Sequence, residues 1–233
     1  MTVPLTLHSL PLFPLGTVLF PAGRLPLQIF EVRYLDMINK CHKTGAPFGV
    51  VALSRGAEVQ KRESGSGPSE SAASGLSQDG NAFAVEAFES FGTLATITQL
   101  QRPQPGLIVV QCLGTQRFQI TKREKLKHGL WVADVTLLSD DQSVSVPPDL
   151  KGPADSLAQI IRNLQLQRVP LEQWPFAEPY NLSDCAWVAN RWCELLQLPL
   201  HVKHGLMALE NPLIRLELVR DLLEQAGIQA NSA

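Results

Sequence analysis

Two histidines, His201 and His204, have the spacing of metal ligands on a helix. Residues three positions apart share one helix face, so both imidazoles could bind the same ion. No third ligand lies at a usable spacing, and structural zinc sites almost always have four ligands. Roles at the surface or at a helix end are therefore favoured for both histidines, and we predict no bound metal and no cofactor.

A possible nucleophile and a possible base are adjacent at Cys41 and His42. Successive residues of a helix point about 100° apart, so these two side chains cannot readily contact each other. A half-buried cysteine beside an exposed histidine is the favoured interpretation. The cysteines, including Cys112, Cys185 and Cys193, have no C-x-x-C spacing, and we expect reduced and mostly buried thiols.

Signatures of the common nucleotide-binding and hydrolytic sites are absent from the sequence. There is no G-x-x-x-x-G-K-[ST] loop to hold a nucleoside triphosphate and no G-x-S-x-G turn to present a nucleophilic serine. We therefore predict no catalytic residues. A hydrolase whose active site is assembled from distant parts of the chain is the alternative.

The balance of charged residues argues against a polyanionic partner. Lys and Arg total 20 and Asp and Glu total 22, which gives a net charge of −2, so nucleic acid is not expected as a partner. No apolar run approaches the ~18 residues that cross a bilayer, and the amino terminus lacks the basic region of a signal peptide. We expect a cytoplasmic protein with no membrane partner.

Three charged residues, Glu31, Arg33 and Arg117, lie within otherwise apolar segments. They could form a recognition patch for a carboxylate or a peptide backbone. They could also form a partly buried ion pair that fixes a helix against a sheet. The second interpretation is favoured because charges among core residues are usually paired. It predicts that Arg117→Ala lowers the melting temperature.

Trp187 is the fourth candidate binding residue. The helix predicted after Ser183 places Trp192 on its apolar face and Trp187 outside that face. Large exposed aromatic side chains are enriched at interfaces, whereas packing inside a helical bundle is the more frequent outcome. Both interpretations stay open from the sequence, and packing is favoured.

The first 143 residues have the patterns of a β-rich domain. The proline-rich segment 10–23 is predicted to form short, edge-like pieces joined by rigid turns, because proline cannot donate to a sheet ladder. At Phe30 the apolar period lengthens, which predicts a helix over 31–43. Further strands are predicted at 48–53, 93–98, 107–110, 118–120 and 131–137, with turns at 104–106, 114 and 127–129. These strands predict an antiparallel meander that closes into a barrel-like sheet.

Residues 56–81 are rich in serine and glycine and contain almost nothing to bury. Such a segment cannot offset the entropy of its own ordering, so we predict a flexible surface insertion. It could act as a tether or recruit a partner. An inserted loop without a specific role is the favoured interpretation.

Residues 144–233 are predicted to be all-helical, after a stiff linker at 146–149. The markers of helix ends are Pro153 and Val169 for the first helix, Ser183 and Leu198 for the second, Leu200 and Leu209 for the third, and Asn211 and Gly227 for the last. The predicted fold class is therefore α+β, with a β-rich domain over 1–143 and a helical bundle over 144–233.

Four stretches of the chain, taken in order, resemble one known family. They are Leu12-Phe13-Pro14-Leu15-Gly16 through Pro21, Leu25-Pro26-Leu27-Gln28-Ile29-Phe30-Glu31-Val32-Arg33-Tyr34, residues 92–97 with 114–120, and Leu198-Pro199 through residues 211–218. They resemble the amino-terminal, substrate-binding domain of ATP-dependent Lon proteases, a family that includes free-standing proteins without ATPase or protease modules. The resemblance implies a PUA-like pseudo-barrel followed by a helical bundle. Two departures are Val32, where the family often has proline, and the insertion before Gly92.

The function implied by the resemblance is a non-catalytic module that binds unfolded or tagged polypeptides, or a protein partner. A groove between barrel and bundle, or an exposed apolar patch, would hold an extended segment by backbone pairing and side-chain pockets. A hydrolase with an unrecognised active site is the alternative. RNA binding by analogy with PUA-like barrels is less favoured because the net charge is close to neutral.

Overall fold

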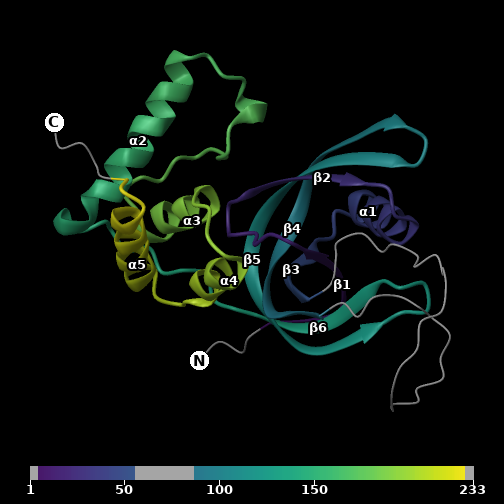
Figure 1. Cartoon of the computed structure of the whole chain (residues 1–233). Helices are drawn as coiled ribbons and strands as arrows, with labels where there is room; N and C mark the ends of the chain where they lie inside the picture. Colours follow the sequence, from purple (N-terminus) through teal and green to yellow (C-terminus); the bar gives the residue numbers. More distant parts are fainter. Residues whose placement is uncertain (1–4, 56–86, 229–233) are drawn as a thin grey trace, which may run out of the picture.

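The strands and the first helix form one half of the molecule, and the later helices form the other half, as Figure 1 shows. The computed structural model describes residues 5–55 and 87–228. The insertion predicted at 56–81 lies outside these residues. The strands are β1 (Thr6–Leu15), β2 (Arg24–Ile29), β3 (Phe48–Arg55), β4 (Ala87–Gln104), β5 (Leu107–Lys125) and β6 (Trp131–Leu137). The helices are α1 (Val32–Thr44), α2 (Lys151–Leu166), α3 (Cys185–Leu195), α4 (Leu200–Ala208) and α5 (Pro212–Gln225), with 3₁₀ turns η1 (Pro148–Leu150) and η2 (Leu171–Gln173).

The strands form one mixed sheet in the order β2-β5-β4-β3-β1-β6. β6 also pairs with β5, so the sheet closes on itself into a barrel. β5 makes this possible by changing partners, since residues 108–113 pair with β2 and residues 118–125 pair with β6. The predicted α+β class with a barrel-like sheet is confirmed. The sheet is not wholly antiparallel, because β2 and α1 form a crossover that brings β3 parallel to β1.

β1 corrects part of the prediction for the proline-rich segment 10–23, because residues 10–15 belong to a strand of 10 residues that continues through Pro11 and Pro14, while residues 16–23 form the loop that leads to β2. Its first part pairs with β6 up to Leu12, and its last part pairs with β3 from Leu12 onward. Among the described residues, Pro11 therefore has a strand beside it only on the β6 side, and Pro14 only on the β3 side. Each proline can leave its missing N–H on the open side, so the strand tolerates both.

Gly114 is a second correction, because it lies inside the 19-residue strand β5 and does not turn the chain. A Cβ atom at this position would lie 2.2 Å from the carbonyl oxygen of Phe20. The N–H of Ala22 donates to the carbonyl of Gly114, and the N–H of Gly114 donates to the carbonyl of Gly23, each over 2.8 Å. The glycine therefore allows the loop between β1 and β2 to approach the sheet.

The helix predicted over 31–43 is confirmed as α1. Glu31 occupies the N-cap position, and Gly45 ends the helix with a φ of 68°, a left-handed conformation that glycine adopts readily. The predicted apolar face, with Tyr34, Ile38 and Cys41, is buried in one cluster with side chains of β1, β2 and β5. α1 therefore packs on the barrel next to the corner where β2 ends.

The helical half follows the prediction except at one cap. Asp184, not Ser183, is the N-cap of α3, and its carboxylate accepts a 2.9 Å hydrogen bond from the backbone N–H of Trp187. Serine and aspartate are both favoured N-cap residues, so the sequence alone does not decide between Ser183 and Asp184. The helix begins at Cys185, and this start makes Asp184 the cap. Asn211 caps α5 as predicted, with Pro212 in the first turn.

One apolar cluster joins the two halves. It contains buried side chains from α2, α3, α4 and α5 together with Val18, Phe20 and Ala52 from the barrel half. Phe20, in the loop between β1 and β2, has no exposed surface. The bundle is therefore packed against the barrel through this loop.

Candidate functional site

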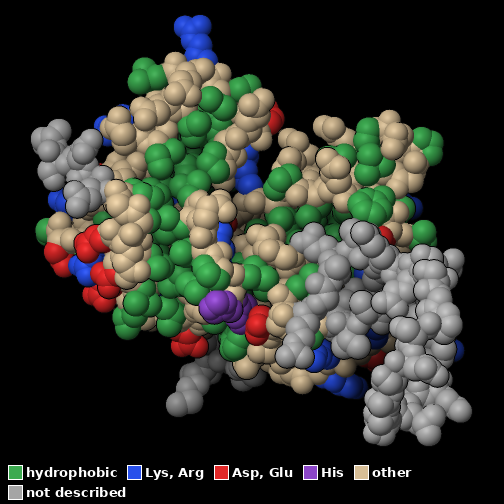
Figure 2. Space-filling view, in the orientation of Figure 1, with side chains coloured by type: hydrophobic (Ala, Val, Ile, Leu, Met, Phe, Trp, Pro, Cys, Tyr) green, Lys and Arg blue, Asp and Glu red, His purple; other side chains and the backbone are tan. Residues whose placement is uncertain are grey.

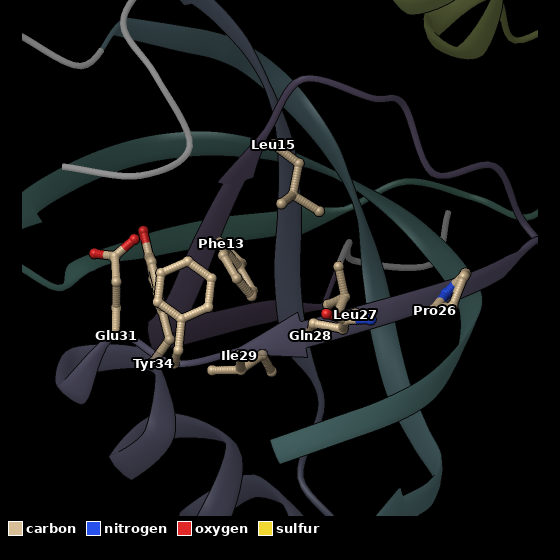
Figure 3. A pocket seen from close by; sticks show the side chains of 9 residues that line it. Phe13, Leu15, Pro26, Leu27, Gln28, Ile29, Glu31 and Tyr34 are labelled. Carbon is tan, nitrogen blue, oxygen red and sulfur yellow. The ribbon is translucent and has the colours of Figure 1, made fainter. Parts of the chain in front are cut away.

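A pocket of about 230 Å³ opens in the barrel between β1 and β2 (Figure 3). Its lining comes from the end of β1, from β2 and from the corner that leads into α1. The lining residues are Phe13, Leu15, Pro26, Leu27, Gln28, Ile29, Phe30, Glu31 and Tyr34. We call this the β1–β2 pocket.

The pocket lies where both strands have an open edge. Within residues 5–55 and 87–228, β2 pairs only with β5. β1 pairs with β6 no further than Leu12, so Phe13, Pro14 and Leu15 have a partner strand only in β3. Backbone N–H and C=O groups along an open edge can pair with an additional strand.

The pocket has an apolar floor and an apolar rim. The rings of Phe13 and Tyr34 stack with their centroids 4.0 Å apart, and Ile29 beside them is buried. Phe30 at the rim is 53% exposed, and Val32, two residues further along the chain, is 73% exposed. Large apolar side chains left exposed beside a pocket are typical of a binding surface.

The structure brings Glu31 and Arg33 together at the corner of this pocket. The Nε of Arg33 lies 2.9 Å from Oε2 of Glu31, and its Nη1 donates a 2.8 Å hydrogen bond to the carbonyl of Gly129 in the β5–β6 turn. The guanidinium also lies 4.4 Å from the centroid of the Tyr34 ring. These contacts fix the start of α1 against the barrel and hold the Glu31 carboxylate at the pocket.

Arg117 does not join this pair and lies instead between barrel and bundle, 3% exposed. Its Nη1 donates to the carbonyls of Met207 and Leu209 over 2.9 and 2.8 Å, and its Nη2 lies 2.7 Å from Oδ1 of Asp141. Burial lowers the pKa of Arg117, and the charge of Asp141 opposes this shift. Arg117 therefore links β5 to the end of α4.

Asp141 also binds a second buried arginine, Arg215 of α5. Nη1 and Nη2 of Arg215 lie 2.6 Å from Oδ2 and 3.1 Å from Oδ1 of Asp141. Arg215 further donates to the carbonyls of Leu206 and Leu209 at the end of α4. These carbonyls carry the partial negative charge of the helix dipole, which offsets the excess positive charge of two arginines around one aspartate. We call Arg117, Asp141 and Arg215 the junction cluster.

A second buried ion pair, Arg191 with Glu194 on α3, holds the loop between β1 and β2. Arg191 donates to the carbonyls of Pro21 and Ala22, and its Nε lies 3.0 Å from Oε2 of Glu194. A Cβ atom on Gly23 would lie 2.0 Å from Oε1 of Glu194 and 2.8 Å from the backbone oxygen of Phe20, and the backbone contact makes glycine necessary there. Burial raises the pKa of Glu194 to about 7, while Arg191 acts in the opposite direction.

Trp187 is buried, with 8% of its surface exposed, although it lies outside the predicted apolar face of α3. Its ring centroid lies 6.2 Å from that of Phe176 and 6.3 Å from that of Tyr180, both in the connector between α2 and α3. The connector covers a second side of α3, which a pattern with one apolar face does not reveal. Trp187 therefore packs in the bundle and does not line the β1–β2 pocket.

The residues with possible catalytic or metal chemistry do not converge. Cys41 is buried, which raises its pKa, while His42 is exposed. In the described part of the chain, no group of three His, Cys, Asp or Glu could hold a metal ion. Burial raises the pKa of Cys112 and of Cys193 to about 12, so both thiols stay protonated near neutral pH. Among these described residues, no helix is both long enough and apolar enough to cross a membrane.

Phe30 was missed as a site residue, although it lies in a segment that the sequence singles out. Leu25 and Ile29 are buried in β2, and the helical pattern starts at Val32. Phe30 lies between the alternating pattern of the strand and the three-to-four-residue pattern of the helix, and neither pattern predicts that its side chain is buried. An aromatic residue at such a change of period is the signal that could have identified the pocket.

Comparisons with known proteins agree with this architecture. A Lon N-terminal domain protein from Xanthomonas campestris has a solved structure with a TM-score of 0.62 and 27% identity, over 92% of this chain and 98% of that chain. The N terminal domain of a Mycobacterium avium complex Lon protease gives a TM-score of 0.54 and 15% identity, over 93% of this chain and 98% of that chain. The second likeness concerns the fold alone. The comparison with curated proteins gives no match.

The family comparison covers most of the sequence. Residues 9–225 match the model of the ATP-dependent protease La (LON) substrate-binding domain. The match includes all of the strands and helices except the first three residues of β1. The chain therefore belongs to the LON substrate-binding domain family.

Proposed function

We propose that the protein is a non-catalytic module that binds an extended polypeptide segment in the β1–β2 pocket. The observation that carries the proposal is the combination, in one place, of an open strand edge and an apolar pocket with Phe30 exposed at its rim. The family to which the chain belongs, named as a substrate-binding domain of a protease, supports a polypeptide as the ligand.

The bound segment would add a strand to the edge of β2. Backbone hydrogen bonds would supply affinity without regard to sequence, and alternate side chains would enter the pocket. Pro26 lacks an N–H, and proline in a sheet places its nitrogen on the open side of an edge strand. Gln28, two residues further, has the same orientation and therefore offers its backbone N–H and C=O to the segment.

The chemistry of the pocket favours a polypeptide over the substrates of the alternative functions. A hydrolytic site needs a nucleophile next to a base, and the pocket lining contains no Ser, Cys, His or Lys. RNA binding needs cationic groups along the strand path, and no Lys or Arg lines the pocket. The carboxylate of Glu31, which does line it, is held by Arg33.

The partners that fit this pocket are unfolded or tagged polypeptides, or a protein partner with an exposed extended segment. Such a segment offers unpaired backbone groups and apolar side chains, which a folded globular surface offers less often. We further propose that the protein works in the cytoplasm, where such chains occur and where its reduced thiols are stable.

Fluorescence anisotropy with a permanently unfolded model polypeptide tests the proposal. We expect saturable binding, with no cleavage of the polypeptide when its length is followed in the same samples. A short apolar peptide should bind as well, and the same peptide with N-methylated backbone amides should bind more weakly because it cannot pair with β2. Cleavage of the polypeptide, or equal binding of both peptides, would contradict the proposed role or the proposed strand pairing respectively.

A further inference from the structure

We propose that a second surface, at the contact between barrel and bundle, binds a cationic and apolar segment of a partner protein. This surface shares no lining residue with the β1–β2 pocket. It is formed by the end of β6, by the segment that follows β6 and by the start of α5 (Figure 1). We call it the junction groove.

The junction groove is larger than the β1–β2 pocket and has an apolar floor. Its volume is about 700 Å³. The apolar residues that line it are Leu137, Leu138, Val144, Pro212 and Leu213. These side chains come from both halves of the molecule, so the groove exists only when barrel and bundle are packed together.

Apolar surface continues from the groove along the outside of α5. Ile214 and Leu218 are 45% and 42% exposed and lie four residues apart, on one face of the helix. Figure 2 shows hydrophobic side chains gathered over the helical half of the molecule. A partner segment longer than the groove would therefore meet further apolar contacts on α5.

The charges that the groove presents to solvent are acidic. Asp140 and Glu210 line it and are both exposed. Arg117 is the cation among the lining residues, but it is 3% exposed, and it donates to Asp141 and to main-chain carbonyls. Glu217, one turn after Leu213 on α5, adds a third exposed carboxylate beside the groove.

The occupant follows from this arrangement of charge. An apolar floor with an acidic rim complements a segment in which Lys or Arg flanks apolar side chains, while nucleic acid and acidic segments are repelled. Because the groove and the β1–β2 pocket are separate, the chain could hold a polypeptide in the pocket while it is docked to a partner through the groove.

The test uses the full chain and short fluorescent peptides with one apolar core flanked by lysine, glutamine or glutamate. The protein variant is the double substitution Asp140→Lys with Glu210→Lys, which changes two exposed residues and none of the three residues of the junction cluster. The matched control is Asp155→Lys with Glu172→Lys, which also reverses two exposed carboxylates but lies outside the groove. Circular dichroism checks that both variants fold.

We expect the lysine peptide to bind most tightly, and we expect its affinity to fall as salt is added. The double reversal in the groove should lower its affinity about tenfold, as expected when two exposed attractions become repulsions, and the control should not. Equal binding of the three peptides, or equal effects of the two double variants, would overturn the proposal. Phe30→Ser should weaken the pocket binding of all three peptides alike and leave the preference for the lysine peptide unchanged, so failure of the pocket proposal and failure of the groove proposal give different results.

Discussion

The junction cluster and the β1–β2 pocket show how this chain uses polar groups in two opposite ways. In the junction cluster, Arg117 and Arg215 are 3% and 1% exposed, and both bind Asp141 and the carbonyls at the end of α4. In the pocket, the backbone of β2 has an open edge and Phe30 is exposed. The difference teaches that the buried charges of the junction cluster stabilise the fold, while the proposed binding surface lies at an edge of the sheet where backbone pairing stops.

This comparison has a physical basis. A buried charge without a partner is strongly unfavourable, so a buried arginine is stable only where its hydrogen bonds are made within the protein. A buried arginine whose hydrogen bonds are made within the protein has few N–H donors left for a ligand. An open strand edge, in contrast, is hydrated in the unbound protein and can exchange water for another backbone.

The largest effect should follow removal of the carboxylate at the centre of the junction cluster. Asp141→Ala leaves Arg117 and Arg215 buried without their shared anion, and we expect the free energy of unfolding to fall by about 3–5 kcal/mol. Urea denaturation followed by circular dichroism measures this change. Asp140→Ala is the control, because its exposed side chain should contribute less than about 0.5 kcal/mol. Similar losses of stability in Asp141→Ala and Asp140→Ala would contradict the view that the buried charges of the junction cluster stabilise the fold.

A smaller loss of stability is expected for Arg117→Ala. Arg215 keeps its contacts with Asp141, but the carbonyls of Met207 and Leu209 lose a donor, so we expect a loss of about 2–3 kcal/mol and a lower melting temperature. Binding of an unfolded polypeptide at low temperature should not change. An unaltered melting temperature together with lost binding would show that Arg117 contacts the ligand.

The strands show best how much of the fold can be predicted from the sequence. Period and turn residues were sufficient to predict the β-rich half, α1 and the order of helices, because these depend on neighbours close in the chain. The continuity of β1 through Pro11 and Pro14 was not predictable, since it depends on which side each proline has a partner strand. Gly114 looked like a turn because only the folded chain brings Phe20 against it.

The candidate site was predictable only in part, for a related reason. Glu31 and Arg33 are two residues apart, so their pairing was within reach of sequence reasoning. Arg117 and Asp141 are 24 residues apart, and Arg215 and Asp141 are 74 apart, so no local pattern joins them. The open edge of β2 is a property of the sheet topology, which the sequence does not express at any single residue.

Phe30→Ser tests whether the β1–β2 pocket contributes to binding rather than to stability. Phe30 is 53% exposed, so the substitution should change stability little, while the lost apolar contact should weaken polypeptide binding by about 1–2 kcal/mol, or roughly tenfold. Anisotropy and thermal melting measure the two effects. Leu166→Ser is the matched control, since Leu166 is 81% exposed on α2 and lies outside the pocket. A loss of binding in the control as large as in Phe30→Ser would mean that exposed apolar surface binds polypeptides without a defined site.

The smallest effect is expected from pH, through Glu194 at the second ion pair. Its pKa in the folded protein is raised to about 7, above the ordinary value of 4.5, so the folded state holds this proton more tightly than the unfolded state does. The contribution of Glu194 to stability is therefore greatest below pH 4.5, falls as the pH rises from 4.5 to 7, and is constant above that.

Because the side chain is 18% exposed and Arg191 opposes the shift, we expect this fall to amount to about 1 kcal/mol. Thermal melts of the wild type and of Glu194→Gln at pH 5 and pH 8 measure it. The amide cannot titrate, so the stability of the variant relative to the wild type should be higher at pH 8 than at pH 5. Glu172→Gln, at an exposed position, is the control and should follow the wild type. A pH dependence of Glu194→Gln identical to that of the wild type would show that this carboxylate is ionised in the folded protein over the whole range from pH 5 to pH 8.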